Sequence, residues 1–383
     1  MQMKIGILTF HFSDNFGALL QAYALQEWLS QKGHDVHFLN YHPLHVEQGG
    51  SFQVPTNSQA IKANLKTLYL KISYFIYKYF GNKTQARLFE EFRRETLGVI
   101  STTIRDSVDL GAASSNFDLL ITGSDQIWSP SVQFGFDSAY FLKFAPSGRP
   151  RKISYAPSFG RDSFGDKELN ELLPLLNSLD SISVRESSGI EIVKKASGRI
   201  ADCVPDPTFL IEDYRPLINS STSDFSKHIF CYALRTGDGI RQTAERASQF
   251  YGAKIRSPYN RHRRWREIGT TIHPGPKDWL SELATAEFVV TNSFHGTAFA
   301  ILLKRPFVVV GLPGFRKQLN SRAMHLLAQH DLTQRFIPYE EIENCEQIFR
   351  QPIDWQAVTQ RQNELRLKGT EYLERELSRV HHD

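Results

Sequence analysis

Residues 288–303 (FVVTNSFHGTAFAILL) constrain the fold of this chain more than any other stretch. An apolar run of strand composition comes first, Asn292 and Ser293 follow it, and from Thr297 onward apolar residues recur at helical spacing. A strand that leads directly into a helix points the free N–H groups and the positive dipole end of that helix outward from the sheet edge. We therefore expect an anion site here, with His295 on it. The alternative is that Asn292 or Ser293 only caps the helix and that His295 packs beneath a loop.

The same order of strand, polar loop and helix opens the chain. Residues 4–10 have strand composition, residues 11–17 (HFSDNFG) have turn and cap residues, and residues 18–31 carry a helical apolar stripe. This is the start of a doubly wound sheet, whose ligands bind beyond the carboxyl ends of the strands. Asn15 is therefore a candidate binding residue. The loop lacks the G-x-G-x-x-G pattern, so a dinucleotide cofactor is not indicated.

A third junction of this kind follows residues 117–122 (FDLLIT). Gly123 comes next and permits close backbone approach, because glycine has no Cβ. Ser124, Asp125 and Gln126 would then project past the carboxyl end of the strand, where a doubly wound sheet binds its ligands. We therefore expect these three side chains to line a binding site.

Cationic side chains follow two further predicted strands. Arg185 comes directly after residues 181–184, and a guanidinium suits bidentate binding of a carboxylate or phosphate. Its alternative role is an ion pair with Glu186. A second group of cations follows the strand at residues 306–310, at Arg316, Lys317 and Arg322.

Length and composition predict a two-domain soluble enzyme, because 383 residues with 41% hydrophobic and 22% charged side chains exceed one ordinary domain. A polar stretch at residues 212–227 breaks the strand and helix periodicity and marks the boundary. We predict two Rossmann-like doubly wound domains that face a common cleft, as in GT-B-like transferases. The expected parts are residues 1–215 with a helical insertion at 61–95, residues 216–350, and a C-terminal helix at 351–383 packing across the domains.

Several classes of protein have no support in the sequence. The net charge of +4 is too small to argue for nucleic-acid binding. The three cysteines, Cys203, Cys231 and Cys345, have no metal-ligand spacing, so neither a zinc site nor a disulfide framework is indicated. A DxD triad and a G-x-x-x-x-G-K-[ST] loop are also missing. We expect no signal peptide, because the first residues run directly into a predicted strand, and no apolar run is long enough to span a bilayer. We therefore expect a cytoplasmic protein.

Residues 61–87 combine an apolar stripe with basic side chains. The stripe consists of Ile61, Leu65, Leu68, Ile72, Phe75, Ile76 and Tyr79, and the basic residues are Lys62, Lys66, Lys71, Lys78, Lys83 and Arg87. Basic amphipathic helices of this kind bind membrane surfaces, which predicts peripheral contact at the inner membrane face. The commoner alternative is that the stripe packs in the core or against a partner, and a homo-oligomer fits the latter.

Six short segments together form a more specific pattern than any one of them alone. They are DNFGALLQAYALQ (14–26), FDLLITGSDQIW (117–128), KISYAPSFG (152–160), SVRESSG (183–189), VPDPTFL (204–210) and TNSFHGTAFAILLKRPF (291–307). In this order and spacing they resemble the polysaccharide pyruvyl transferase family. The resemblance implies transfer of pyruvate from phosphoenolpyruvate to sugar hydroxyls of a cell-surface polysaccharide precursor, as a ketal.

This implied chemistry assigns roles to the candidate residues. Phosphoenolpyruvate carries a phosphate and a carboxylate, so its site needs cations and N–H donors. We assign His295 to the phosphate and leaving-group side, Asp125 to the acceptor hydroxyl as base or orienting group, and Arg185 to the carboxylate. Further substrate-binding candidates are Asn15, Ser124, Gln126, Asn292, Ser293, Arg316, Lys317 and Arg322. The scheme requires no metal and no cofactor, and its partners are phosphoenolpyruvate and a sugar or lipid-linked oligosaccharide acceptor.

The sequence departs from the family pattern at two places. The resemblance implies an arginine two residues before His295, where this chain has Ser293, and a glycine-rich loop where this chain has GSDQ (123–126). The anionic groups of the donor would therefore need Arg185 or the cations that follow residues 306–310. Two alternatives remain open: a GT-B glycosyltransferase that uses a nucleotide sugar, and a non-catalytic carbohydrate-binding member of a polysaccharide assembly complex.

Overall fold

A computed structural model of the chain describes residues 2–47, 50, 52, 54, 58–218, 227–234, 237–259 and 268–380. The chain forms two compact units. Unit 1 comprises Met1–Ile211 and Arg366–Asp383, and unit 2 comprises Glu212–Leu365. The units therefore meet at 211/212 and 365/366 in the chain, whereas the sequence places the boundaries at 215/216 and 350/351. Part of the predicted linker, residues 219–226, lies outside the described residues. Each unit is described below by itself.

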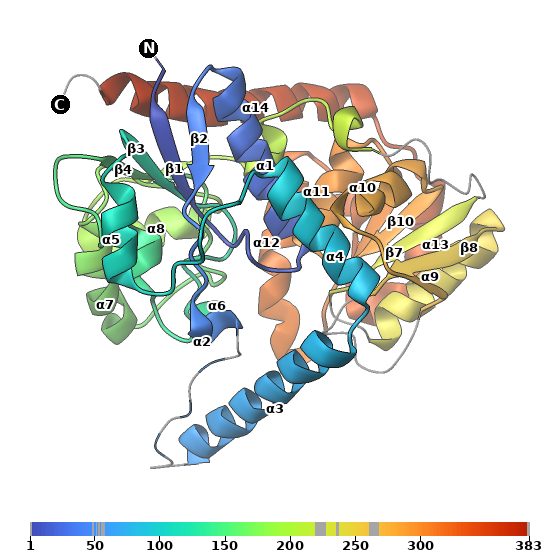
Figure 1. Cartoon of the computed structure of the whole chain (residues 1–383). Helices are drawn as coiled ribbons and strands as arrows, with labels where there is room; N and C mark the ends of the chain where they lie inside the picture. The colour runs from blue at the N-terminus through green and yellow to red at the C-terminus, as the bar shows by residue number, and fades with distance from the viewer. Residues whose placement is uncertain are drawn as a thin grey trace. The chain divides into compact units, whose positions relative to one another are not determined.

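Unit 1 is built on a parallel sheet of order β2-β1-β3-β4 (Figure 1). A bridge between Ile153 and Ser181 leads from its last strand to a short parallel pair, β5 and β6. In such an order the chain passes first to one side of β1 and then to the other, so the topological switch point lies between β1 and β3. The strands are β1 (Lys4–Leu8), β2 (Asp35–Phe38), β3 (Leu119–Thr122), β4 (Arg151–Ser154), β5 (Ser183–Val184) and β6 (Asp202–Cys203).

The helices of unit 1 begin with α1, whose predicted stripe is buried. The chain leaves this helix at Gly33, whose φ of 85° is a conformation that glycine adopts at low cost. Residues 58–80 and 83–96 form helices, in the segment 61–95 where the sequence predicts one or more helices. The elements are α1 (Phe16–Gln31), α2 (Leu44–Glu47), α3 (Ser58–Phe80), α4 (Lys83–Glu91), η1 (Phe92–Thr96), α5 (Ser107–Ser114), α6 (Pro130–Gln133), η2 (Ser138–Phe141), α7 (Asp166–Leu176), α8 (Ser187–Ser197) and η3 (Pro207–Phe209).

Unit 2 contains a parallel sheet of order β12-β11-β10-β7-β8-β9. Its strands β10, β7 and β8 are labelled in Figure 1. Counted along the chain from β7, the strand order is the 3-2-1-4-5-6 order of the Rossmann fold, with its switch point between β7 and β10. All four residues of β10 are buried, as their apolar composition predicts. The strands are β7 (His228–Tyr232), β8 (Lys254–Pro258), β9 (Thr270–Ile272), β10 (Phe288–Thr291), β11 (Phe307–Val310) and β12 (Phe336–Ile337).

Helices connect β7 to β8, β9 to β10, β10 to β11 and β11 to β12, as parallel neighbours require a crossover between strands. The helices of unit 2 are η4 (Arg215–Leu217), α9 (Asp238–Tyr251), α10 (Pro276–Thr285), α11 (Phe294–Leu302), η5 (Gly314–Asn320), α12 (Ser321–Gln329), η6 (Thr333–Arg335), η7 (Tyr339–Asn344), α13 (Cys345–Arg350) and the first part of α14 (Trp355–Arg379). The predicted fold class, two Rossmann-like doubly wound units, is therefore confirmed. The shared cleft stays a prediction.

The last part of α14 belongs to unit 1 and packs against its sheet. The Tyr372 hydroxyl donates to the carbonyl oxygen of Ser154 at the end of β4, at 2.9 Å. Arg151 of the same strand pairs with the buried carboxylate of Glu376 at 2.7 Å. No helix among the described residues has the length and apolar character needed to cross a membrane.

Candidate active site

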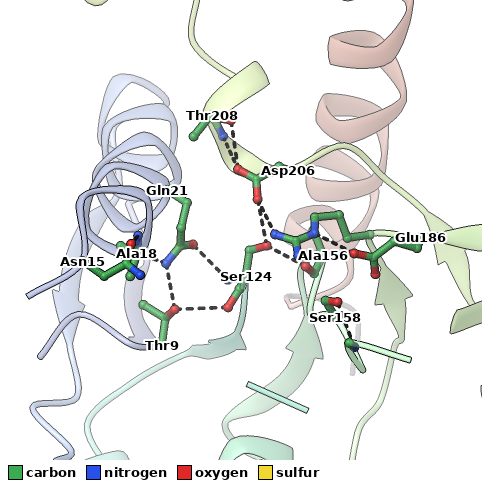
Figure 2. Close-up of polar contacts among 12 residues, drawn as sticks. Thr9, Asn15, Ala18, Gln21, Ser124, Ala156, Ser158, Glu186, Asp206 and Thr208 are labelled. Carbon is green, nitrogen blue, oxygen red and sulfur yellow. Dashed lines mark hydrogen bonds and ion pairs between the residues drawn. The ribbon is translucent and has the colours of Figure 1, made fainter. Parts of the chain in front are cut away.

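The carboxyl ends of β1 and β3, at the switch point of unit 1, are tied together by the buried side chain of Gln21 from α1 (Figure 2). Its Nε2 donates to Thr9 Oγ1 at 2.9 Å, and its Oε1 accepts from the backbone N–H of Ser124 at 3.1 Å. Thr9 Oγ1 in turn donates to the carbonyl oxygen of Ser124 at 3.3 Å. The loop after β3 is thereby held against α1 through polar atoms that have no access to water.

The loop after β3 turns sharply because two of its residues have positive φ. Gly123 has a φ of 131°, and a Cβ there would collide with the carbonyl oxygen of Tyr155 on the neighbouring segment. Asp125 has a φ of 68°, a conformation that aspartate tolerates better than most residues. Trp128 anchors the other side of the loop, since it is fully buried and stacks on Phe141 at 4.8 Å.

The side chains at the tip of this loop differ in their access to solvent. Ser124 is buried, and its hydroxyl donates to the carbonyl oxygen of Ala156 at 2.6 Å. Asp125 and Gln126 are half-buried, as expected for side chains that project past the strand end. The carbonyl oxygen of Asp125 accepts from Ser158 N–H at 2.8 Å, which fixes the backbone from which the carboxylate extends.

Asn15 lies at the same sheet edge, at the start of α1 (Figure 2). Its side-chain oxygen accepts from the N–H of Ala18 at 3.3 Å, so Asn15 is the N-cap of this helix. A cap of this kind satisfies one of the free N–H groups of the first turn. The structure therefore gives Asn15 a structural role, and its contact with substrate stays a prediction.

Asp206 is the centre of a second buried group. Its Oδ1 accepts from both the N–H and the hydroxyl of Thr208, at 3.1 and 2.9 Å. Its Oδ2 accepts from Arg185 Nη1 at 2.9 Å and lies 3.5 Å from Ser124 Oγ (Figure 2). Asp206 thus connects the end of β5 to the loop after β3.

Arg185 follows β5 as predicted, but its guanidinium is 2% exposed and held by two carboxylates of the protein. Nε donates to Glu186 Oε1 at 3.0 Å, in addition to the bond from Nη1 to Asp206. Burial alone would lower the pKa of Arg185, but Glu186, Asp206 and Asp125 together raise it above its ordinary value. The ion pair with Glu186 that the sequence left open therefore forms. Both carboxylates already bind this guanidinium, so its contact with a donor carboxylate stays a prediction.

His11, at the end of β1, is a buried titratable residue that was not selected from the sequence. Its ring nitrogens lie 3.0 Å from the carbonyl oxygen of Thr9 and 3.1 Å from Asn40 Oδ1. Burial lowers the pKa of His11 to about 4, against the hydrogen bond to Asn40, which raises it. His11 is therefore neutral at pH 7. A polar residue directly after a buried strand was the signal in the sequence.

Asn292, which follows β10, lies at the switch point of unit 2. Its Oδ1 accepts from the N–H of Leu234 at 2.9 Å and so connects the carboxyl ends of β7 and β10. Thr291 makes a second connection, because its hydroxyl donates to the carbonyl oxygen of Tyr232 at 2.8 Å. Asn292 thus lies where a Rossmann sheet binds its ligands.

Ser293 and His295 form the start of α11, as the sequence predicted. Ser293 is the N-cap, and its hydroxyl accepts from the N–H of Gly296 at 3.3 Å. A Cβ on Gly296 would collide with Thr291 Oγ1, so glycine lets the helix begin close against the strand. The His295 ring is 8% exposed and packs edge-on against Phe294 at 5.2 Å. The capping role that was left open for Ser293 is therefore observed, and His295 lies on the first turn of the helix.

The predicted cations Arg316, Lys317 and Arg322 follow β11, the strand next to β10. Arg316 and Arg322 are half-buried, whereas Lys317 is exposed and pairs with Glu340 at 2.7 Å. Asn320 holds this segment in place through two hydrogen bonds with the backbone of Leu312. The cations therefore belong to the same carboxyl edge of the sheet as His295. Among the described residues no cluster of His, Cys, Asp or Glu is arranged to hold a metal ion.

Comparison with known families gives a match over most of the chain. The model of the family described as polysaccharide pyruvyl transferase matches residues 15–312. The chain belongs to the polysaccharide pyruvyl transferase family. The matched region begins at Asn15 and includes Gln21, Ser124, Asn292 and His295. Thr9 and His11 lie before it, and Arg316, Lys317 and Arg322 lie beyond it. No curated protein matches the sequence.

Solved structures resemble this pyruvyl transferase family member at low identity. A structure from Listeria monocytogenes, assigned as a UDP-N-acetylglucosamine 2-epimerase, has a TM-score of 0.53 at 10% identity, over 97% of this chain and 95% of its own. The UDP-GlcNAc 2-epimerase from Neisseria meningitidis has a TM-score of 0.48 at 12% identity, over 99% and 100%. The first likeness shows the fold alone, the two-unit α/β architecture of GT-B proteins.

Proposed function

We propose that this member of the polysaccharide pyruvyl transferase family transfers pyruvate from phosphoenolpyruvate to hydroxyl groups of a sugar. The observation that carries the proposal is the family match over residues 15–312, which contains the loop after β3 and the start of α11. The acceptor we propose is a precursor of a cell-surface polysaccharide. On this proposal the reaction takes place in the cytoplasm, at the inner membrane face when the acceptor is lipid-linked.

The proposed reaction forms a ketal at C2 of the pyruvyl group. C3 of phosphoenolpyruvate takes up one proton, the oxygen of one sugar hydroxyl bonds to C2, and the C2–O bond to phosphate breaks. A second hydroxyl then bonds to C2 and closes the ketal. The two hydroxyls lose two protons, of which C3 keeps one and the departing phosphate takes the other. The reaction therefore needs groups that transfer protons and groups that hold an anionic donor, but no oxidant and no cofactor.

The charge around the switch point of unit 1 favours the sugar there over the donor. Asp125, Glu186 and Asp206 surround the single guanidinium of Arg185, which leaves an excess of negative charge. A trianionic donor would be repelled by this group, whereas sugar hydroxyls donate readily to carboxylates. We therefore assign Asp125 to the acceptor hydroxyl, as base or orienting group, with Ser124, Gln126 and Asn15 as its neighbours at the sheet edge.

The charge around the carboxyl edge of unit 2 favours the donor. The N-terminus of α11 presents backbone N–H groups and a positive dipole end at His295, and the three cations after β11 add positive charge at the same edge. We assign His295 to proton transfer at the leaving phosphate. Arg316, Lys317 and Arg322 then replace the cation that Ser293 does not supply, and Asn292 contributes an amide. This arrangement does not require Arg185 to bind the donor carboxylate.

Mass spectrometry of candidate acceptors tests the proposal. Incubation with phosphoenolpyruvate should add the mass of a pyruvate ketal to the acceptor and release inorganic phosphate in equal amount. Phosphate release without acceptor modification, or turnover of a nucleotide sugar instead, would contradict it. Acceptor binding with neither reaction would support a non-catalytic carbohydrate-binding protein. That alternative is suggested by Ser293, which stands where the family resemblance implies an arginine.

A further inference from the structure

The helix α3 carries its apolar residues on the outside of the protein. Eight large hydrophobic side chains on it are exposed, with relative exposures from 46% to 62%. At 100° per residue they occupy one stripe about 120° wide along the helix. They are Ile61, Leu65, Leu68, Tyr69, Ile72, Phe75, Ile76 and Tyr79. In Figure 1, α3 stands clear of the β1–β4 sheet of unit 1, and α4 follows it.

The side of α3 opposite this stripe is the covered one. Thr67, which lies on that side, is 4% exposed, and Leu70 and Ser73 are half-buried. An ordinary surface helix shows the reverse pattern, with its apolar side against the core and its polar side in water. A contiguous apolar stripe of this length in solvent marks a surface that binds something.

The charges on α3 indicate what it binds. The helix sequence contains lysines at positions 62, 66, 71 and 78 and no acidic residue. Lys62 lies about 80° to one side of the stripe centre and Lys71 about 100° to the other, so positive charge flanks the apolar residues on both edges. Two copies of α3 packed stripe to stripe would bring lysines together without any carboxylate to pair them. An anionic surface, by contrast, supplies negative charge to pair with these lysines.

We propose that α3 lies along an anionic lipid surface. Its apolar stripe enters the boundary between headgroups and acyl chains, and its flanking lysines extend their stems over the apolar surface to reach lipid phosphates. The helix has 23 residues and is therefore roughly 35 Å long. Binding of this kind is reversible and sensitive to salt, because part of it is electrostatic. The proposal does not depend on the transfer reaction.

Co-sedimentation of the full chain with phosphatidylcholine vesicles that contain increasing phosphatidylglycerol tests the proposal. We expect binding that rises with the phosphatidylglycerol content and falls at 0.5 M salt. The Lys62→Glu/Lys71→Glu variant should bind at least about tenfold more weakly. Its control is Lys194→Glu/Lys195→Glu, which makes the same charge change at exposed positions on α8 and should bind as the wild type does.

A second, uncharged variant isolates the apolar contribution. Ile72→Ser/Phe75→Ser keeps every charge and should also reduce binding about tenfold or more, because two half-exposed apolar side chains no longer enter the bilayer. Circular dichroism checks that both variants remain folded, and sedimentation without vesicles excludes self-association. Absence of binding to anionic vesicles at low salt would overturn the proposal. Equal binding to neutral vesicles would also overturn it. A third contrary result would be a wild-type dimer that becomes monomeric in Ile72→Ser/Phe75→Ser while lipid binding stays unchanged.

Discussion

Removal of the carboxylate of Asp206 should destabilise unit 1 by about 3 kcal/mol. The substitution is Asp206→Asn, which keeps the shape of the side chain. Asp206 is fully buried and accepts from Arg185 Nη1 at 2.9 Å and from Thr208 twice. An asparagine can keep its oxygen on Thr208, but its NH₂ group then faces the guanidinium, which is also a donor.

The magnitude follows from the burial of the charge that remains. Breaking a buried ion pair on one side costs about 3–5 kcal/mol, because the other charge stays in a low-dielectric site without compensation. Glu186 still accepts from Nε of Arg185 at 3.0 Å, so the lower end of this range applies. The matched control is Asp202→Asn, which removes the same charge from an exposed pair with Arg375 in the same unit and should cost less than about 1 kcal/mol.

Urea unfolding measures both variants, with the free energy extrapolated to water and the m-values compared. Hydrogen exchange of peptides from β4 and β5 reports on unit 1 separately, because it resolves local opening. High salt should reduce the small effect of Asp202→Asn and leave that of Asp206→Asn nearly unchanged, since buried charges are screened little. If Asp206→Asn costs no more than Asp202→Asn, the buried group around Arg185 does not stabilise unit 1.

Three further predictions concern the two sheet edges. His295→Ala should leave a folded protein with turnover lowered about 10²-fold or more, the scale of a lost proton-transfer group, and wild-type turnover would reduce His295 to a packing residue. Arg185→Lys should lower kcat nearly as much as Arg185→Ala, because one ammonium cannot replace the planar fork between Glu186 and Asp206; a raised KM for phosphoenolpyruvate with unchanged kcat would instead indicate donor binding. Burial holds the pKa of His11 at about 4, so as pH falls the unfolded chain is protonated first, and stability should drop by about 3 kcal/mol between about pH 6.5 and 4. His11→Gln should flatten that drop in unit 1 peptides followed by hydrogen exchange, and an unchanged profile would contradict the assignment.

The sequence alone determined the local elements and their chemical character. The buried strand, the cap at Ser293 and the helix that carries His295 follow from residues next to one another in the chain, so periodicity and cap chemistry predict them. The same holds for α1 with its cap at Asn15, and for the alternation of strand and helix that makes both sheets parallel. The family resemblance agreed with these elements and with the match over residues 15–312.

Tertiary structure alone decided which side chains meet and which remain in solvent. Gln21 reaches Ser124 across 103 positions of sequence, and Arg185 reaches Asp206 across 21, because strand order brings their loops to one edge of a sheet. No local sequence pattern predicts that strand order. The sequence therefore suggested that Arg185 binds a substrate carboxylate, whereas in the structure Glu186 and Asp206 bind it. The stripe of α3 shows the same limit. Helical spacing reveals an apolar face, but whether that face is covered depends on what packs against it, and the fold of this chain leaves it exposed.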